Sequence, residues 1–435
     1  MILNKINIYL FLLILNFSYF FSGFLNTGVC DNLWNIQSSN TTHILNRLFF
    51  SDTLNGWATG DSGIIIHTTN GGLNWNMQTT NTLNFVYDIR FLNSNTGWAV
   101  ASDIFNYPDP VLLKTTNGGL SWVSHAFADT TLLLFTVCFI NELTGWVGGY
   151  HGSVLKTTDG GSGWILQNYD TSQYRYNSIN RIKFYNGSRG SACGGTIDLA
   201  GIIWNLTNSG NNWFAQGVAA EPLYDIYYLD SNNIFLTGGD FEFGLTVFNS
   251  TNSGVTWNFN PLYYFGVGKA ISFRTHYEAW IPLYFSPFFA VTTNNGNNWF
   301  ELQTPDNSTL NDVFFVDSLH GWAAGNGGAL YKYNNSLIGI IENRKPAGSW
   351  FTVSTNYPNP FNSSTEITVR IFKQAFVKMT VYDCLGNEIE ILANGIYNTG
   401  SYKFLFDGSR LSSGIYFCKT EINNNRYINK MVLIK

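Results

Sequence analysis

The chain has 435 residues, of which only 12% are charged and 17% are aromatic, and it contains 42 glycines. This composition favours an all-β protein rich in turns over a helical one. The net charge of −5 gives no basic footprint for nucleic acid, so we expect no nucleic-acid partner.

The first 30 residues have the pattern of a secretory signal peptide. Lys5 precedes an apolar run that begins at Ile8 and continues to Phe21, which matches the positive start and short apolar core of such peptides. A membrane anchor is the alternative, although Asn16 interrupts the run and the run is short for a membrane span. We therefore predict a signal peptide in residues 1–30.

One eight-residue stretch recurs through residues 31–335. It reads TTNGGLNW from Thr68 to Trp75, returns as TTNGGLSW ending at Trp122 and as TTDGGSGW ending at Trp164, and has looser copies ending at Trp213, Trp257 and Trp299. A period of 42 to 49 residues with turn residues and no helical pattern is typical of four-stranded propeller blades. The Asn or Asp of each turn is expected to accept backbone N–H bonds, a structural role that we assign to Asn70, Asn117, Asp159, Asn208, Asn252 and Asn294.

A second repeat marks the same blades independently. Gly-Trp or its equivalent recurs at Trp57, Trp98, Trp146, Ser191, Phe235, Trp280 and Trp322. Seven residues before each of these positions stands an aromatic residue: Phe50, Phe91, Phe139, Phe184, Tyr228, Phe273 and Phe315. An apolar residue two positions earlier shares a strand face with each aromatic. The seven copies predict seven blades.

The seventh copy lacks its Trp strand, and a spare one stands at the front of the propeller region. WNIQ at Trp34–Gln37 matches WNMQ at Trp75–Gln78. We therefore predict a seven-bladed β-propeller in residues 31–335 that is closed by the N-terminal strand, because this interlock leaves only short edges.

The composition changes after this region. Residues 336–349 include a charged and then Pro- and Gly-containing stretch, which we interpret as a linker. Residues 350–435 return to alternating apolar and polar residues, which predicts a small antiparallel β-sandwich.

The C-terminal part strongly resembles the C-terminal sorting domain of type IX secretion. The resemblance rests on NYPNPFN at Asn356–Asn362, VYD at Val381–Asp383, LSSGIY at Leu411–Tyr416 and the ending KMVLIK. It implies recognition by the type IX secretion machinery, passage through the periplasm of a Bacteroidetes-type bacterium, and a secreted or cell-surface location after removal of the domain. Cys384 and Cys418 stand where such tails more often carry apolar residues, and they could pair with each other.

The repeats resemble the Asp-box propellers, and within them the photosystem II assembly and stability factor type. The pattern is Gly-Trp-Ala-x-Gly followed by Thr-Thr-Asn-Gly-Gly-x-x-Trp, and copies four to six depart from its Gly-Gly. The resemblance implies the fold. It says little about the partner, because bacterial members occur where there is no photosystem.

Charged residues are concentrated at one position of the repeat. Three residues before each aromatic, at the expected start of the innermost strand, stand Arg47, Asp88, Thr136, Arg181, Asp225, Ala270 and Asp312. Opposed charges around a narrow channel can simply neutralise one another, since buried charges need partners. The alternative is a ligand site at one mouth of the channel, with arginines for anionic or hydroxylated groups. The candidate ligand-binding residues are Arg47, Asp88, Arg181, Asp225 and Asp312.

The chemistry expected of Asp-box enzymes is weakly represented. Arg274 lies in a stretch that faintly resembles a sialidase element, and Asp88, Asp225 and Asp312 could supply a glycosidase pair, but no spacing supports either. The histidines and cysteines show no metal spacing. We assign no catalytic residue, metal or cofactor.

These features favour an exported, monomeric propeller that acts as a non-catalytic binding module for an unidentified glycan or protein. Two alternatives stay open: an Asp-box glycoside hydrolase, and an assembly or stability factor for an envelope protein complex.

Overall fold

The computed structural model describes residues 33–103, 109–167, 173–240, 242–334, 351–354, 356–383, 387–422 and 425–435. These residues form β-strands and two short 3-10 helices, η1 (Tyr150–Gly152) and η2 (Asn326–Gly328), which confirms the all-β class. None of the described segments is a helix long and apolar enough to cross a membrane. The predicted signal peptide and the predicted linker lie outside the described residues.

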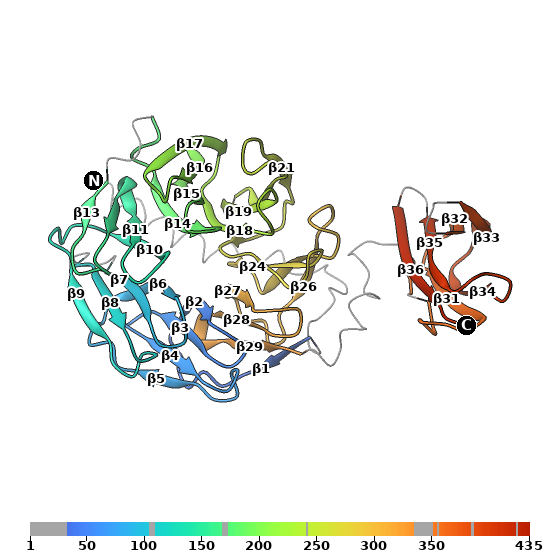
Figure 1. Ribbon diagram of the computed structural model, residues 1–435, viewed down its shortest axis with the longest axis horizontal. Coiled ribbons are helices and arrows are strands. Elements are labelled where there is room, and N and C mark those ends of the chain that lie inside the picture. The colour runs from blue at the N-terminus through green and yellow to red at the C-terminus, as the bar shows by residue number, and fades with distance from the viewer. Residues whose placement is uncertain are drawn as a thin grey trace, which may run out of the picture.

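In the described part of residues 34–333 the strands form seven antiparallel sheets, which Figure 1 shows arranged around a common centre. The first strands of the sheets are β2 (Leu45–Phe50), β6 (Phe85–Phe91), β10 (Leu134–Phe139), β14 (Ser178–Phe184), β18 (Leu223–Tyr228), the short pair β22 (Val267–Gly268) and β23 (Ser272–Phe273), and β27 (Leu310–Phe315). The second strands are β3 (Gly56–Gly60), β7 (Gly97–Ser102), β11 (Gly145–Gly149), β15 (Gly190–Thr196), β19 (Ile234–Asp240), β24 (Ala279–Tyr284) and β28 (Gly321–Gly325).

The outer half of each sheet completes this pattern. The third strands are β4 (Ile65–Thr68), β8 (Val111–Thr115), β12 (Val154–Thr157), β16 (Ala200–Thr207), β20 (Gly244–Ser250), β25 (Phe288–Thr292) and β29 (Leu330–Tyr333). The last strands are β5 (Asn76–Gln78), β9 (Val123–Ala126), β13 (Ile165–Leu166), β17 (Asn212–Ala219), β21 (Asn258–Pro261), β26 (Phe300–Gln303) and, in the sheet of β27–β29, β1 (Trp34–Ile36). First strands of successive sheets contact one another from β2 to β18, β22 contacts β19 and β20 of the fifth sheet, β23 contacts β27, and β27 contacts β2.

The N-terminal strand β1 is the outermost strand of the seventh sheet. It pairs with β29 in the register Trp34↔Tyr333. The Trp34 ring is buried; it stacks on Phe289 at 5.3 Å and meets Trp280 edge-on at 5.5 Å, both in the sixth sheet. The first described residues of the chain are thus packed between its sixth and seventh sheets.

Tryptophans of the Gly-Trp repeat join several of the sheets to the next one. The Trp57 ring stacks on Phe91 of the following sheet, with centroids 3.7 Å apart, and its indole N–H donates to the Gly118 carbonyl at 3.0 Å. Gly118 belongs to the turn between the third and last strands of that following sheet, so the two sequence repeats meet in space. Trp98 repeats this contact with Phe139 and Gly160.

The same contact links the seventh sheet to the first. Trp322 stacks on Phe50 at 3.6 Å and donates to the Gly71 carbonyl at 3.2 Å. Trp280 departs from this pattern, because its indole N–H donates to the Glu278 carboxylate at 2.7 Å. Trp146 departs from it in another way. It stacks on Phe184, but its buried indole N–H has no hydrogen-bond partner among the described residues.

This difference predicts unequal effects of two otherwise similar substitutions. Trp322→Phe should lower the free energy of unfolding by about 1 kcal/mol more than Trp146→Phe, because only Trp322→Phe removes an intersheet hydrogen bond. Urea unfolding followed by tryptophan fluorescence measures both. Equal losses would show that the indole N–H contributes nothing.

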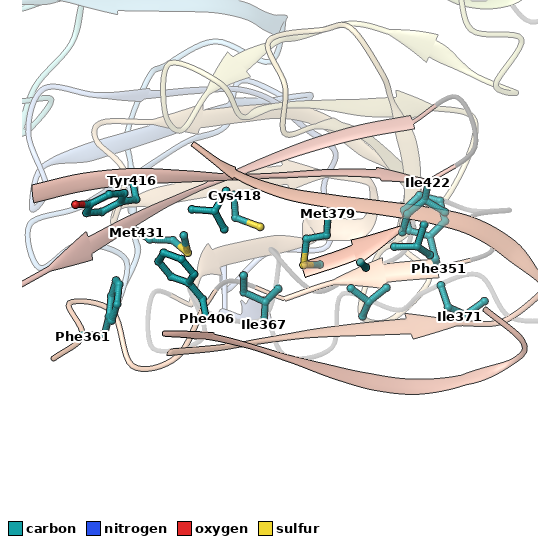
Figure 2. Packing of buried hydrophobic residues seen from close by; sticks show 14 of the residues in the cluster. Phe351, Phe361, Ile367, Ile371, Met379, Phe406, Tyr416, Cys418, Ile422 and Met431 are labelled. Carbon is teal, nitrogen blue, oxygen red and sulfur yellow. The ribbon is translucent and has the colours of Figure 1, made fainter. Parts of the chain in front are cut away.

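The C-terminal residues form two further antiparallel sheets. One contains β30 (Phe351–Val353), β31 (Ser364–Ile371) and β34 (Gly400–Asp407); the other contains β33 (Glu388–Tyr397), β32 (Ala375–Tyr382), β35 (Gly414–Ile422) and β36 (Asn425–Leu433). Alternate residues of β31 are buried, as a strand with one core face requires. Figure 2 shows Ile367, Met379, Phe406 and Met431, contributed by both sheets, in a single core.

Two features of this region bear on the sequence motifs. The buried Asn356 side chain, at the start of NYPNPFN, donates to the Pro358 carbonyl at 3.1 Å and to the Thr365 hydroxyl at 3.0 Å. Cys418 is a free thiol in the core, and burial raises its pKa to about 12. Its suggested partner, Cys384, lies outside the described residues.

Candidate functional site

A β-bulge precedes the charged repeat position in six of the first strands. The register shifts are between Leu45/Arg47, Val86/Asp88, Leu134/Thr136, Ile179/Arg181, Leu223/Asp225 and Leu310/Asp312. A bulge leaves one residue unpaired and re-aims the side chain that follows. Glycine stands opposite most of these bulges. At Gly60, for example, a Cβ would lie 2.0 Å from the Ile44 carbonyl oxygen, which explains the second glycine of Gly-Trp-Ala-x-Gly.

The three aspartates at this position accept backbone N–H groups from the following sheet. Asp88 Oδ2 accepts from Val137 N at 3.0 Å, and Asp225 Oδ2 accepts from Ile271 N at 3.1 Å. Asp312 Oδ2 accepts from Leu48 N at 2.7 Å, across the junction of the seventh and first sheets. Each carboxylate therefore joins two neighbouring first strands.

The remaining carboxylate oxygens form ion pairs. Arg181 pairs with Asp88 Oδ1, and its Nε lies 3.2 Å from Asp225 Oδ1. Lys183 Nζ lies 2.7 Å from the same oxygen of Asp225. We call Asp88, Arg181, Lys183 and Asp225 the central ion cluster; it connects the second, fourth and fifth sheets.

Arg47 and Asp312 form a second, looser pair. Arg47 Nη1 lies 3.7 Å from Asp312 Oδ1 and donates to the Lys269 carbonyl at 3.1 Å. Burial outweighs the attraction of Arg47 and raises the pKa of Asp312.

Attraction and burial act differently on the members of the central ion cluster: at Lys183 burial outweighs the attraction of Asp225 and lowers the pKa of the amine. Burial opposes the charge on Asp225, but Lys183 and Arg181 outweigh it and lower the pKa of Asp225 to about 2. Burial also opposes the charge on Arg181, yet Asp88 and Asp225 raise the pKa of its guanidinium. Asp225 and Arg181 are therefore charged at neutral pH.

This cluster predicts a specific acid sensitivity. The folded-state pKa of Asp225 is depressed below its ordinary 3.8, so its contribution to stability is present above pH 4 and is lost as the pH falls towards 2. We expect that contribution to be about 2 kcal/mol. Asp225→Asn should therefore be less stable than wild type at pH 6, and the difference should shrink by pH 2.5.

Tryptophan fluorescence in a urea titration checks this, because every Trp except Trp350 lies between Trp34 and Trp322. A stability difference that stays constant from pH 6 to 2.5 would contradict the assigned pKa shift.

A second ring of side chains lies two residues further along the same strands. Strand alternation points these residues to the same side as the charged position. They are Phe49, Arg90, Cys138, Lys183, Tyr227, Ser272 and Phe314, one from each sheet, and all seven line one cavity of about 500 Å³. We call this space the channel cavity.

The channel cavity also takes in most of the predicted ligand-binding residues. Asp88, Arg181, Asp225 and Asp312 line it, whereas Arg47 is not among its lining residues. The sequence analysis did not predict the second ring. The strand alternation could have identified it, because each of its residues follows the charged repeat position by two.

The second ring is not chemically uniform. Phe314, Phe49 and Arg90 follow one another in neighbouring sheets; the two phenyl centroids are 5.7 Å apart, and the Arg90 guanidinium lies 5.2 Å from the Phe49 ring centroid. Tyr227 lines the cavity from the fifth sheet, and Tyr185, 43% exposed, lines it beyond the end of β14. The channel cavity thus combines aromatic rings, hydroxyl groups and cations.

The turn residues lie elsewhere, between the third and last strands. Asn70 Oδ1 accepts the Thr68 hydroxyl at 3.0 Å and the Asn74 N–H at 2.9 Å. The corresponding backbone bond recurs at Asn117, Asp159, Asn252 and Asn294.

Asn208 departs from this pattern. Leu206 occupies the position of the first Thr, so the hydroxyl that braces the other turns is missing. Strand pairing continues to Thr207↔Asn212, and Asn208 lies in the tight connection with a φ of 50°. No side-chain bond of the Asn70 kind forms at Asn208 among the described residues.

Comparison with known proteins bears on each part of the chain. Residues 355–435 match the family model described as the secretion system C-terminal sorting domain. This match indicates handling by the type IX secretion machinery and export as a secreted or surface-attached protein. No curated protein matches the chain.

Solved structures support the propeller fold. "YCF48 bound to D1 peptide" is 17% identical with a TM-score of 0.57, covering 71% of this chain and 99% of that one. "YCF48 from Cyanidioschyzon merolae" is 15% identical with a TM-score of 0.56, covering 70% and 99%. A GH74 xyloglucanase from Xanthomonas campestris is 10% identical with a TM-score of 0.55, covering 77% of this chain and 59% of its own. At these identities the likeness concerns the fold alone.

Proposed function

We propose that this chain is an exported seven-bladed β-propeller, closed by β1, that acts as a non-catalytic binding module through its channel cavity. The C-terminal residues form a β-sandwich that directs export and is removed afterwards. Support for the blade number comes from the seven sheets and from the contact between β27 and β2. Asn70 and its equivalents have a structural role in this proposal, because they brace turns away from the cavity.

The observation that carries the binding function is the composition of the channel cavity. All seven first strands contribute to it, and its walls offer aromatic rings and an exposed cation. A cavity of this volume, in which aromatic rings stand beside polar and charged groups, has the size of a small-ligand site.

The carboxylates that line the cavity are already bound to other groups of the protein, which argues against glycoside hydrolysis. A two-carboxylate glycosidase needs an acid and a base or nucleophile that both face the substrate. Here Asp88 and Asp225 share Arg181 as a cation, and each accepts an N–H group from the next strand. These residues therefore hold the first strands together.

A protein segment is the second candidate ligand. One structural neighbour is YCF48 bound to a D1 peptide, and a peptide end would also fit a cavity of this volume. In that case the chain would serve an envelope protein as an assembly or stability factor.

The test is a binding screen of the purified full chain against arrays of glycans and peptides, with product analysis on every hit. We expect binding without turnover. Hydrolysis of a bound glycan that is abolished by Asp225→Asn or Asp312→Asn, with the variant still folded and binding, would replace this proposal by the hydrolase.

A further inference from the structure

The charges that line the channel cavity do not all cancel locally. Asp88 and Asp225 are paired with Arg181 and Lys183, and Asp312 is paired with Arg47. Arg90 also lines the cavity, it is exposed, and among the described residues it has no acidic partner. One cation therefore remains available to a ligand.

The position of Arg90 is defined by its aromatic neighbour. Its guanidinium lies over the Phe49 ring, and Phe49 is held by Phe91 at 6.0 Å and Phe314 at 5.7 Å. A guanidinium above a ring keeps its N–H edge free for a planar anion. A carboxylate accepts two parallel N–H bonds from such an edge, and these charge-assisted bonds are strong.

The rest of the cavity restricts the body of the ligand. The central ion cluster links three of the sheets, and a ligand reaches the cavity from the side where Arg90 and Tyr185 are exposed. Phe314 offers an apolar ring, and Ser272 and Tyr227 add hydroxyl groups from the two preceding sheets. A hydroxylated ring with an apolar face matches this wall better than an aliphatic acid does.

We propose that the channel cavity binds the terminal unit of a carboxylated sugar, with its carboxylate on Arg90 and its ring against Phe314. This assignment rests on the proposed binding function and adds the class of ligand. A neutral sugar would leave Arg90 without its anion, which is why the acidic sugar is favoured.

The experiment is isothermal titration calorimetry of the full chain with trigalacturonate, with neutral galactotriose and with a tetrapeptide that ends in a free carboxylate. Trigalacturonate should bind at least about tenfold more tightly than galactotriose, and more weakly as salt rises. Stronger binding of the tetrapeptide than of trigalacturonate would overturn the assignment in favour of a peptide end.

A matched pair of variants locates the carboxylate. Arg90→Gln should weaken trigalacturonate binding about tenfold or more. Arg175→Gln should leave it unchanged, because Arg175 is also an exposed arginine over a ring, that of Tyr176 at 4.6 Å, but does not line the cavity.

Two results separate this inference from the binding proposal itself. Equal loss in both variants, or no loss in either, overturns the carboxylate site but leaves a binding module whose ligand is of another class. Failure of the chain to bind any member of the glycan and peptide arrays overturns both.

Discussion

Trp34→Ala is expected to lower the free energy of unfolding by about 3–5 kcal/mol, the usual cost of truncating a buried Trp. The Trp34 ring contacts Phe289, Trp280 and Phe315, which belong to two different sheets. Its loss would leave a cavity between the sixth and seventh sheets and would weaken the attachment of β1. The effect should match that of Trp75→Ala, since Trp75 is equally buried and its ring lies 5.8 Å from that of Phe50 in the first sheet, the distance between Trp34 and Phe315.

Chemical unfolding followed by tryptophan fluorescence gives this quantity. Ile36→Ala is the matched control, because Ile36 lies on the same strand but is 59% exposed and should change stability by less than about 0.5 kcal/mol. If Trp34→Ala unfolds like the control, β1 does not close the propeller.

The second large effect concerns export. A chain that ends at Asn335 lacks residues 355–435, which match the sorting domain, and should remain in the periplasm of a host with type IX secretion. Cell fractionation and immunoblotting of the truncated and full chains measure the distribution. The propeller strands share no hydrophobic cluster with the C-terminal core among the described residues, so the truncated chain should show the same fluorescence-detected melting transition as the full chain.

Normal amounts of this folded, truncated chain at the cell surface would show that residues 355–435 are not needed for export. Retention of an unfolded chain would contradict the expected independence of the propeller.

The strand pattern of the fold could be predicted because each repeat carries its own structural reason. The glycine before Trp57 leaves room for the Phe50 ring, and Trp57 itself stacks on Phe91 of the next sheet, so the residue pattern repeats together with the contact. The strand at Trp34 could be predicted as the missing outer strand for the same reason, and it pairs with β29. Asn208 was assigned to the turn pattern wrongly, because Leu206 removes the bracing hydroxyl and the hairpin extends instead.

The candidate site was less predictable. The positions of its charged residues in the repeat could be predicted, but their ion-pair partners could not. Asp88, for example, forms its ion pair with Arg181, which lies two sheets further on. The β-bulges were also overlooked, although they leave a mark in the sequence. Leu45 and Leu48 are both buried at a spacing of three, which breaks the alternation of a regular strand.

The central claim is that ligands meet this protein in the channel cavity, and hydroxyl-radical footprinting of the full chain with a saturating hit from the binding screen tests it most directly. Tyr185, Tyr227 and Phe314 line the cavity, and we predict that their oxidation falls when the ligand is bound. Tyr263 and Phe265 are exposed aromatic residues that do not line the cavity, and their oxidation should not change. Protection of Tyr263 and Phe265 with unchanged oxidation of the three cavity residues would contradict the account.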